Sequence, residues 1–202
     1  MAPDERRAAI VDATLPLVLR HGAGVSTRQI AEAAGIAEGT IFRVFPDKEA
    51  VIQAVTAKAF DPEPTLRELR EIDRSLPFRE RVTACVVIGQ RRLRGVFRLI
   101  DALGMTGPPP ADDESAAERR RVNEAFLSAV VAVIGEDADQ LRVPALEFAR
   151  NVQLFMFSAT HPMISQGRPL AAEEIVSILL DGMRRVPDPT PSTSHHLQMI
   201  ED

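Results

Sequence analysis

The chain has 202 residues, of which 45% are hydrophobic, and this is typical of a globular protein with one or two domains. The net charge of −5, with only 4% aromatic residues and no Trp or Tyr, argues against a protein that stacks single-stranded nucleic acid on aromatic rings. One cysteine excludes an intramolecular disulfide, and neither a signal-peptide pattern nor a membrane-length apolar stretch is present, so we expect a cytoplasmic protein with no membrane partner.

Apolar residues recur with helical spacing along almost the whole chain, and strand patterns are nearly absent. A first helix is expected to end at Gly22 and Gly24, and Gly35 separates two short helices. A connecting helix is predicted from Lys48 to Phe60, and longer helices follow to about residue 186. The sequence therefore predicts an all-α protein.

The same glycines and predicted helix ends also predict the domain organisation. Residues 1–50 form a three-helix N-terminal domain, which the connecting helix extends to about residue 60. Residues 61–186 form a C-terminal helical bundle. Residues 187–202 have no periodic apolar face, and we expect a disordered tail.

The two short helices have the local signals of a helix-turn-helix. Ser26 and Gln29 have the spacing of a capping box, in which each side chain bonds the other residue's amide. Gly35 permits the left-handed backbone of a sharp turn. Ile41 and Phe45, four residues apart, are expected to pack the second short helix inward. Two short helices joined through a glycine turn are a helix-turn-helix.

The segment from Arg6 to Ala54 resembles the N-terminal domain of the TetR family of transcriptional regulators. Five pieces carry the resemblance in order and spacing: a first helix that ends at His21-Gly22, Thr27-Arg28-Gln29-Ile30-Ala31, Ala34-Gly35-Ile36, Glu38-Gly39-Thr40-Ile41-Phe42, and Phe45-Pro46-Asp47-Lys48-Glu49. The resemblance implies a homodimeric, ligand-responsive repressor that binds a palindromic operator in double-stranded DNA. It also implies that the C-terminal bundle binds the effector and forms the dimer.

Eight residues are expected to contact DNA: Thr27, Arg28, Glu38, Gly39, Thr40, Phe42, Arg43 and Lys48. Gly39 lets the recognition helix approach a phosphate, to which the Thr40 hydroxyl and the Lys48 amine can donate. The fork of Arg43 matches the two acceptors of guanine in the major groove. By resemblance to the family, the ring of Phe42 lies against the DNA backbone.

Four features depart from what a DNA-binding domain of this family leads one to expect. Phe42 stands where family members commonly have Tyr, so a phosphate donor is missing, and Ala37 stands where they often have Ser, which removes a helix cap worth ~1 kcal/mol. Glu38 faces a polyanion, so it either accepts from a cytosine amine or sits clear of the phosphates. The first fifty residues carry six basic and seven acidic side chains. The alternative interpretation is a helical interaction protein whose helix-turn-helix no longer reads DNA.

Two C-terminal helices are apolar almost all round, and such helices must bury two faces. One face can meet the protein's own core, and we expect the other to meet a second copy of the chain. The residues predicted for this dimer interface are Val152, Met156, Ile175, Ile178, Leu179 and Met183.

The resemblance also implies an effector pocket, for which the middle helices offer Phe97, Met105, Phe126, Phe148 and Phe155. The same side chains can equally fill the core. The expected effector is largely apolar and its identity is unknown. Two basic clusters, Arg91-Arg92-Leu93-Arg94 and Arg119-Arg120-Arg121, are either solvated helix faces or sites that capture an anionic effector.

Enzymatic chemistry finds no support in the sequence. No Ser/His/Asp arrangement, glycine-rich phosphate loop, zinc-ligand spacing or convincing pair of carboxylates is present. We therefore expect neither catalysis nor a cofactor or metal.

Overall fold

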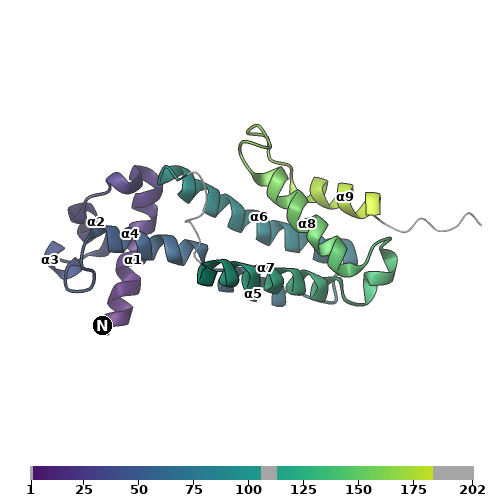
Figure 1. Cartoon of the computed structure of the whole chain (residues 1–202), viewed down its shortest axis with the longest axis horizontal. Coiled ribbons are helices and arrows are strands. Elements are labelled where there is room, and N and C mark those ends of the chain that lie inside the picture. Colours follow the sequence, from purple (N-terminus) through teal and green to yellow (C-terminus); the bar gives the residue numbers. More distant parts are fainter. Residues whose placement is uncertain (1, 106–112, 184–202) are drawn as a thin grey trace, which may run out of the picture.

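The computed structural model describes residues 2–105 and 113–183, and the elements within these ranges are all helices, which confirms the predicted all-α class (Figure 1). The α-helices are α1 (Pro3–His21), α2 (Thr27–Ala34), α3 (Glu38–Ile41), α4 (Lys48–Phe60), α5 (Glu63–Arg70), α6 (Phe78–Ala102), α7 (Asp113–Ile134), α8 (Ala145–Thr160) and α9 (Ala172–Met183). Short 3-10 helices follow α1 (η1, Gly22–Gly24) and α7 (η2, Gly135–Gln140). None of these helices is both long and apolar enough to cross a lipid bilayer. The predicted tail, 187–202, lies outside the described residues.

Helices α1 to α4 lie together at one end of the molecule (Figure 1). They enclose a hydrophobic core in which Val18, Ile30, Ile41 and Phe45 are fully buried. Helix α1 packs against both α2 and α4. This small core holds the two short helices at a fixed angle, because each of them contributes a buried isoleucine to it.

Helices α5 to α9 surround a second and larger core. Its buried members come from every one of these helices and include Leu69, Val86, Ile134, Phe148 and Ile175. Helix α6 packs against α7, α8 and α9, and α7 packs against α5 and α8. The element order and the helix contacts are those of an antiparallel helical bundle.

Helix α6 belongs to both cores. Cys85 and Val86, in its first half, are buried in the C-terminal core, whereas Leu99 near its end is buried in the N-terminal one. Leu103, just after α6, packs against the same N-terminal cluster. A boundary at residue 60 therefore separates residues that pack together in space, which the local sequence signals could not reveal.

Candidate nucleic-acid interface and effector cavity

The turn between α2 and α3 forms as the sequence predicts. The Gln29 amide donates to the Ser26 hydroxyl at 3.2 Å, and the Ser26 amide donates to the Gln29 side-chain oxygen at 2.9 Å, which completes the capping box. Gly35 ends α2 with φ 64° and ψ 34°, a left-handed conformation that glycine adopts without a Cβ penalty. The Ile36 amide then donates to the Ala31 carbonyl at 3.0 Å, which closes the turn.

Helix α3 has only four residues and is held by its apolar side. Ile41, its last residue, and Phe45, just beyond it, are fully buried in the N-terminal core. The opposite side of this segment carries exposed residues: Glu38, Gly39, Phe42 and Arg43, with half-buried Thr40. Half of the Phe42 surface is exposed. As the sequence suggests, Ala37 provides no side-chain cap.

Thr27 and Glu38 interact with each other across the turn. The Thr27 hydroxyl, at the start of α2, donates a hydrogen bond to the Glu38 carboxylate at the start of α3. The carboxylate of Glu38 thus has a hydrogen-bond donor within the protein, which the sequence did not predict. Arg28, one residue further along α2, is exposed.

Lys48 is engaged within the protein as well. Its ammonium donates to the carbonyl of Ala23 at 3.0 Å, and the side chain is half-buried. Lys48 thereby ties the start of α4 to η1, the segment that leads into α2. The carboxylate of Asp47 caps the same helix by accepting from the Ala50 amide at 2.7 Å.

Arg7 of α1 is a residue of this surface that the sequence analysis did not single out. Its guanidinium lies over the ring of Phe45, 4.2 Å from the centroid, and it donates to the Val44 carbonyl at 3.5 Å. Arg7 is exposed on α1, yet it contacts the loop directly after α3. No local signal could have shown this, because the two segments are 37 residues apart. Together with Arg28 and Arg43 it places three cationic side chains on the surface of this domain.

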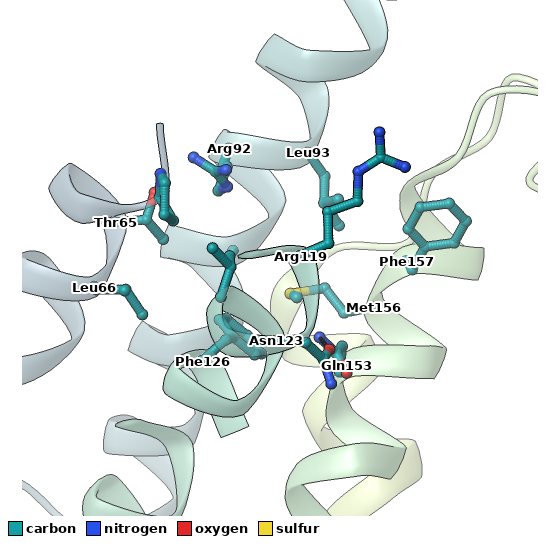
Figure 2. Close-up of a pocket in the computed structure, with 13 residues that line it drawn as sticks. Thr65, Leu66, Arg92, Leu93, Arg119, Asn123, Phe126, Gln153, Met156 and Phe157 are labelled. Atoms are coloured by element: carbon teal, nitrogen blue, oxygen red, sulfur yellow. Dashed lines mark hydrogen bonds between the residues drawn. The ribbon is translucent and has the colours of Figure 1, made fainter. Parts of the chain in front are cut away.

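The C-terminal bundle contains a cavity of about 260 Å³ between α5, α6, α7 and α8 (Figure 2). Thirteen residues line it: Pro62, Thr65, Leu66, Gly89, Arg92, Leu93, Arg119, Val122, Asn123, Phe126, Gln153, Met156 and Phe157. Most are apolar, and each basic cluster named from the sequence contributes one arginine. A cavity of this kind, mostly apolar with a few polar groups, is typical of a small-molecule site.

The five residues proposed from sequence for the effector site are found in different places. Phe126 lines the cavity. Phe148 is fully buried in the core, and Phe155 packs against the core half-buried. Phe97 forms edge-to-face contacts with Phe157 and His161, with ring centroids 5.4 and 4.7 Å apart.

Met105, the fifth of these residues, follows the end of α6 and is half-buried outside the cavity lining. Of the five proposed residues, Phe126 alone is among those that line this cavity. The positions of the other four favour the alternative interpretation, in which they are core or surface residues.

Four of the six residues predicted for the dimer interface are buried within the chain itself. Val152, Met156, Ile175 and Leu179 belong to the C-terminal core, with at most 5% of each exposed. This corrects their assignment, since a buried side chain cannot contact a second copy. Ile178 is 52% exposed, and the side chain of Met183 lies outside the described part.

Other large apolar side chains of α8 are exposed instead. Leu154 and Phe157 lie about two and three helical turns after Leu146 along α8, and the exposed fractions of Leu146, Leu154 and Phe157 are 45%, 66% and 43%. With Ile178 of α9 they form a set that we call the α8/α9 face. Such a set of exposed apolar side chains is typical of an interaction surface.

Comparison with known proteins agrees with this geometry. Residues 10–55 match the family model described as bacterial regulatory proteins, tetR family. The same region is 41% identical over 61 residues to the HTH-type transcriptional repressor KstR of Rhodococcus jostii strain RHA1. That match covers 30% of this chain and 29% of the relative, so it includes less than a third of either protein.

Solved structures share the fold over almost the whole chain. A tetR-family transcriptional regulator from Streptomyces coelicolor aligns with a TM-score of 0.62 and 22% identity, over 90% of this chain and 80% of that one. The superantigen PfiT aligns with a TM-score of 0.60 and 19% identity, over 92% and 99%. At these identities the likeness shows the fold alone. The N-terminal region of this chain, residues 10–55, thus carries the signature of the tetR family, on a fold that solved structures share over almost the whole chain.

Proposed function

We propose that the chain is a ligand-responsive transcriptional repressor that binds a palindromic operator as a homodimer. The observation that carries the proposal is the exposed side of the α3 segment. Phe42 and Arg43 point outward there, while Ile41 and Phe45 anchor the segment in the core. A short helix held in this way can enter the major groove without rearrangement.

Gly39 supports the same proposal. A Cβ added at Gly39 would meet no protein atom within 4 Å, and its backbone does not have a positive φ. Packing within the chain therefore does not require glycine at this position. Close approach of the backbone to an external phosphate would require it.

The individual roles follow from the contacts. Arg43 is the proposed base reader, while Arg28 and Thr40 contact the phosphate backbone. Lys48 and Thr27 act mainly by positioning, because each already has a partner within the protein. Phe42 contributes apolar contact with sugar or a thymine methyl group.

The dimer is proposed to form through the α8/α9 face rather than through the residues first predicted. Its four apolar side chains are exposed on helices that the rest of the chain covers on the other side. A two-fold interface of this kind would pair two recognition segments, and the spacing of the operator half-sites would reflect that symmetry.

A gel-shift titration tests the proposed function. The probe is the DNA that flanks the protein's own coding region, used at two salt concentrations with the unaltered protein, Arg43→Ala and Arg142→Ala. Arg142 is an exposed arginine in the C-terminal bundle and serves as the control. We expect affinity to fall steeply as salt rises, because phosphate contacts release counterions. Arg43→Ala should weaken binding about tenfold or more.

The rival interpretation, an interaction protein with an inactive helix-turn-helix, predicts a different result. Any residual DNA binding would then be equally strong in Arg43→Ala and in the control. Equal binding by these two variants would overturn the proposed role of the recognition segment.

A further inference from the structure

The charged side chains that line the cavity are both cationic. Arg92 of α6 and Arg119 of α7 both line it, and none of the lining residues that the structure describes is Asp or Glu. The two side-chain amides of the lining bond to each other, since Gln153 donates to the Asn123 oxygen at 2.7 Å. The rest of the wall is mainly apolar, with Leu66, Phe126 and Met156 among its members. Positive charge beside an apolar wall suits a ligand with an anionic end and an apolar body.

Arg92 also connects the cavity with α4, the helix that follows the helix-turn-helix in the chain. Its two terminal nitrogens donate to the carbonyl oxygens of Phe60 and Asp61, at 2.7 and 2.5 Å, at the end of α4. Burial lowers the pKa of the Arg92 guanidinium from its usual value, and the nearby Asp61 carboxylate opposes that shift. A guanidinium has five N–H donors, so these two bonds leave donors for a further acceptor.

The two arginines lie on different sides of the cavity. In Figure 2 the Arg92 side chain points toward the segment that carries Thr65, whereas Arg119 stands on the side of Phe157. Neighbouring Arg91 differs from Arg92, because it is exposed and forms an ion pair with Glu68. Arg91 is not part of the lining. The cluster Arg91-Arg92-Leu93-Arg94 thus divides into residues directed to solvent and residues directed to the cavity.

We propose that the cavity binds an amphipathic anion. Its carboxylate or phosphate group binds at Arg92, with Arg119 adding positive charge, and its apolar body lies among Leu66, Phe126 and Met156. An anion at Arg92 binds the same guanidinium whose other donors hold the carbonyls of Phe60 and Asp61. Ligand binding is thereby coupled to the end of α4. This inference rests on the proposed function only where ligand binding is taken to affect DNA binding. The chemistry of the ligand rests on the cavity alone.

Calorimetric titration of the full chain without DNA tests the proposal. The ligands are decanoate, decanoyl-coenzyme A and 1-decanol, which share a ten-carbon chain and differ in the charged end. We expect decanoate or decanoyl-coenzyme A to bind at least tenfold more tightly than 1-decanol, because a buried charge-assisted bond to arginine is lost in the alcohol. Tighter binding of decanoate identifies a carboxylate site, and tighter binding of the thioester identifies a phosphate site.

Two variants locate the anion. Arg92→Met keeps an unbranched side chain but removes its charge, and it should reduce the preference for the anion at least fivefold. Arg91→Met is the matched control and should keep the preference. Equal or tighter binding of 1-decanol by the unaltered protein, absence of binding by both anions, or an unchanged preference in Arg92→Met would each overturn the proposal. The comparison of ligands on the unaltered protein does not depend on the folding of a variant, and no outcome depends on DNA binding.

Discussion

Gly22, at which α1 ends, lies directly against the carbonyl oxygen of Ala102, the last residue of α6. Gly22 has a φ of 60°, in the left-handed region, and a Cβ built on it would overlap that oxygen. That oxygen is a backbone atom, and it cannot move aside as the end of a flexible side chain can. The contact therefore fixes the end of α6, which comes from the C-terminal bundle, against the N-terminal helices.

Replacing Gly22 by alanine should lower the free energy of unfolding by about 2–4 kcal/mol, because the new methyl group forces a strained φ and a backbone overlap. Gly24→Ala is the matched control. A Cβ at Gly24 would meet no atom within 4 Å, and its φ is not positive, so a change below about 1 kcal/mol is expected. Urea denaturation measures both. A loss in Gly22→Ala no larger than in the control would show that the contact is not rigid.

Glu38→Gln removes a negative charge from the proposed DNA-binding side but keeps an oxygen that can accept from Thr27. We expect DNA affinity to rise a few-fold, since one like charge near a phosphate costs about 1 kcal/mol in water. Glu136→Gln, an exposed carboxylate in η2, controls for the change in net charge. Fluorescence anisotropy with operator DNA measures the difference. Weaker binding of Glu38→Gln would instead indicate that the carboxylate accepts from a base.

Leu154→Glu tests the proposed dimer, because Leu154 is the most exposed residue of the α8/α9 face. The variant should fold normally and be monomeric at low micromolar concentration, since a charge in an apolar interface lacks a partner. Ala8→Glu, exposed on α1, is the control and should remain dimeric. Light scattering after size-exclusion chromatography gives the mass. A dimeric Leu154→Glu would mean that the copies meet elsewhere.

A buried ion pair joins the start of α6 to η2. Arg81 is buried and pairs with half-buried Asp137. Asp137→Leu alone should destabilise the protein by about 1–3 kcal/mol, because it leaves a buried cation uncompensated. Adding Arg81→Met should recover most of this loss.

The exposed pair of Arg70 and Glu63, at 2.9 Å, provides the comparison for that experiment. Arg70→Met should cost under about 1 kcal/mol. Thermal unfolding of Asp137→Leu, the double variant and Arg70→Met gives the three changes in stability. A double variant as unstable as Asp137→Leu would show that the loss comes from packing and not from the unpaired charge.

Cys85 should be unreactive in the folded protein. Burial raises the pKa of its thiol to about 12, although the positive charge of Arg74 opposes the shift. A raised pKa keeps the thiol protonated at pH 8, and only the thiolate reacts with aromatic disulfide reagents. Labelling should therefore be at least about 1000-fold slower in the folded chain than in denaturant. Rapid labelling of the native protein would reveal local opening of α6.

The local parts of the site could be predicted from the sequence. The capping box at Ser26 and the turn at Gly35 depend on residues within a few positions of each other, and both form as expected. The connecting helix also begins at Lys48 and ends at Phe60 as predicted. Each signal was complete within one segment, so no knowledge of packing was needed.

The remaining features depend on contacts between distant segments. The sequence shows that α8 is apolar all round, but not that Val152 faces the core while Leu154 faces outward. Likewise, the arginine cluster gives no sign that Arg92 reaches the carbonyls 31 and 32 residues before it. Which side of a helix is covered, and by what, is decided by packing between elements rather than by the composition of one of them.

The sharing of α6 between two cores sets a limit on how members of this fold can be recombined. A chimera that exchanged only residues 1–60 would pack a foreign three-helix unit around Leu99 and would set a foreign α1 end against Ala102. A functional exchange of operator specificity would therefore have to carry the end of α6 with it, or change only the outward side of α3. The residues that position the proposed recognition segment therefore do not coincide with the N-terminal domain predicted from the sequence.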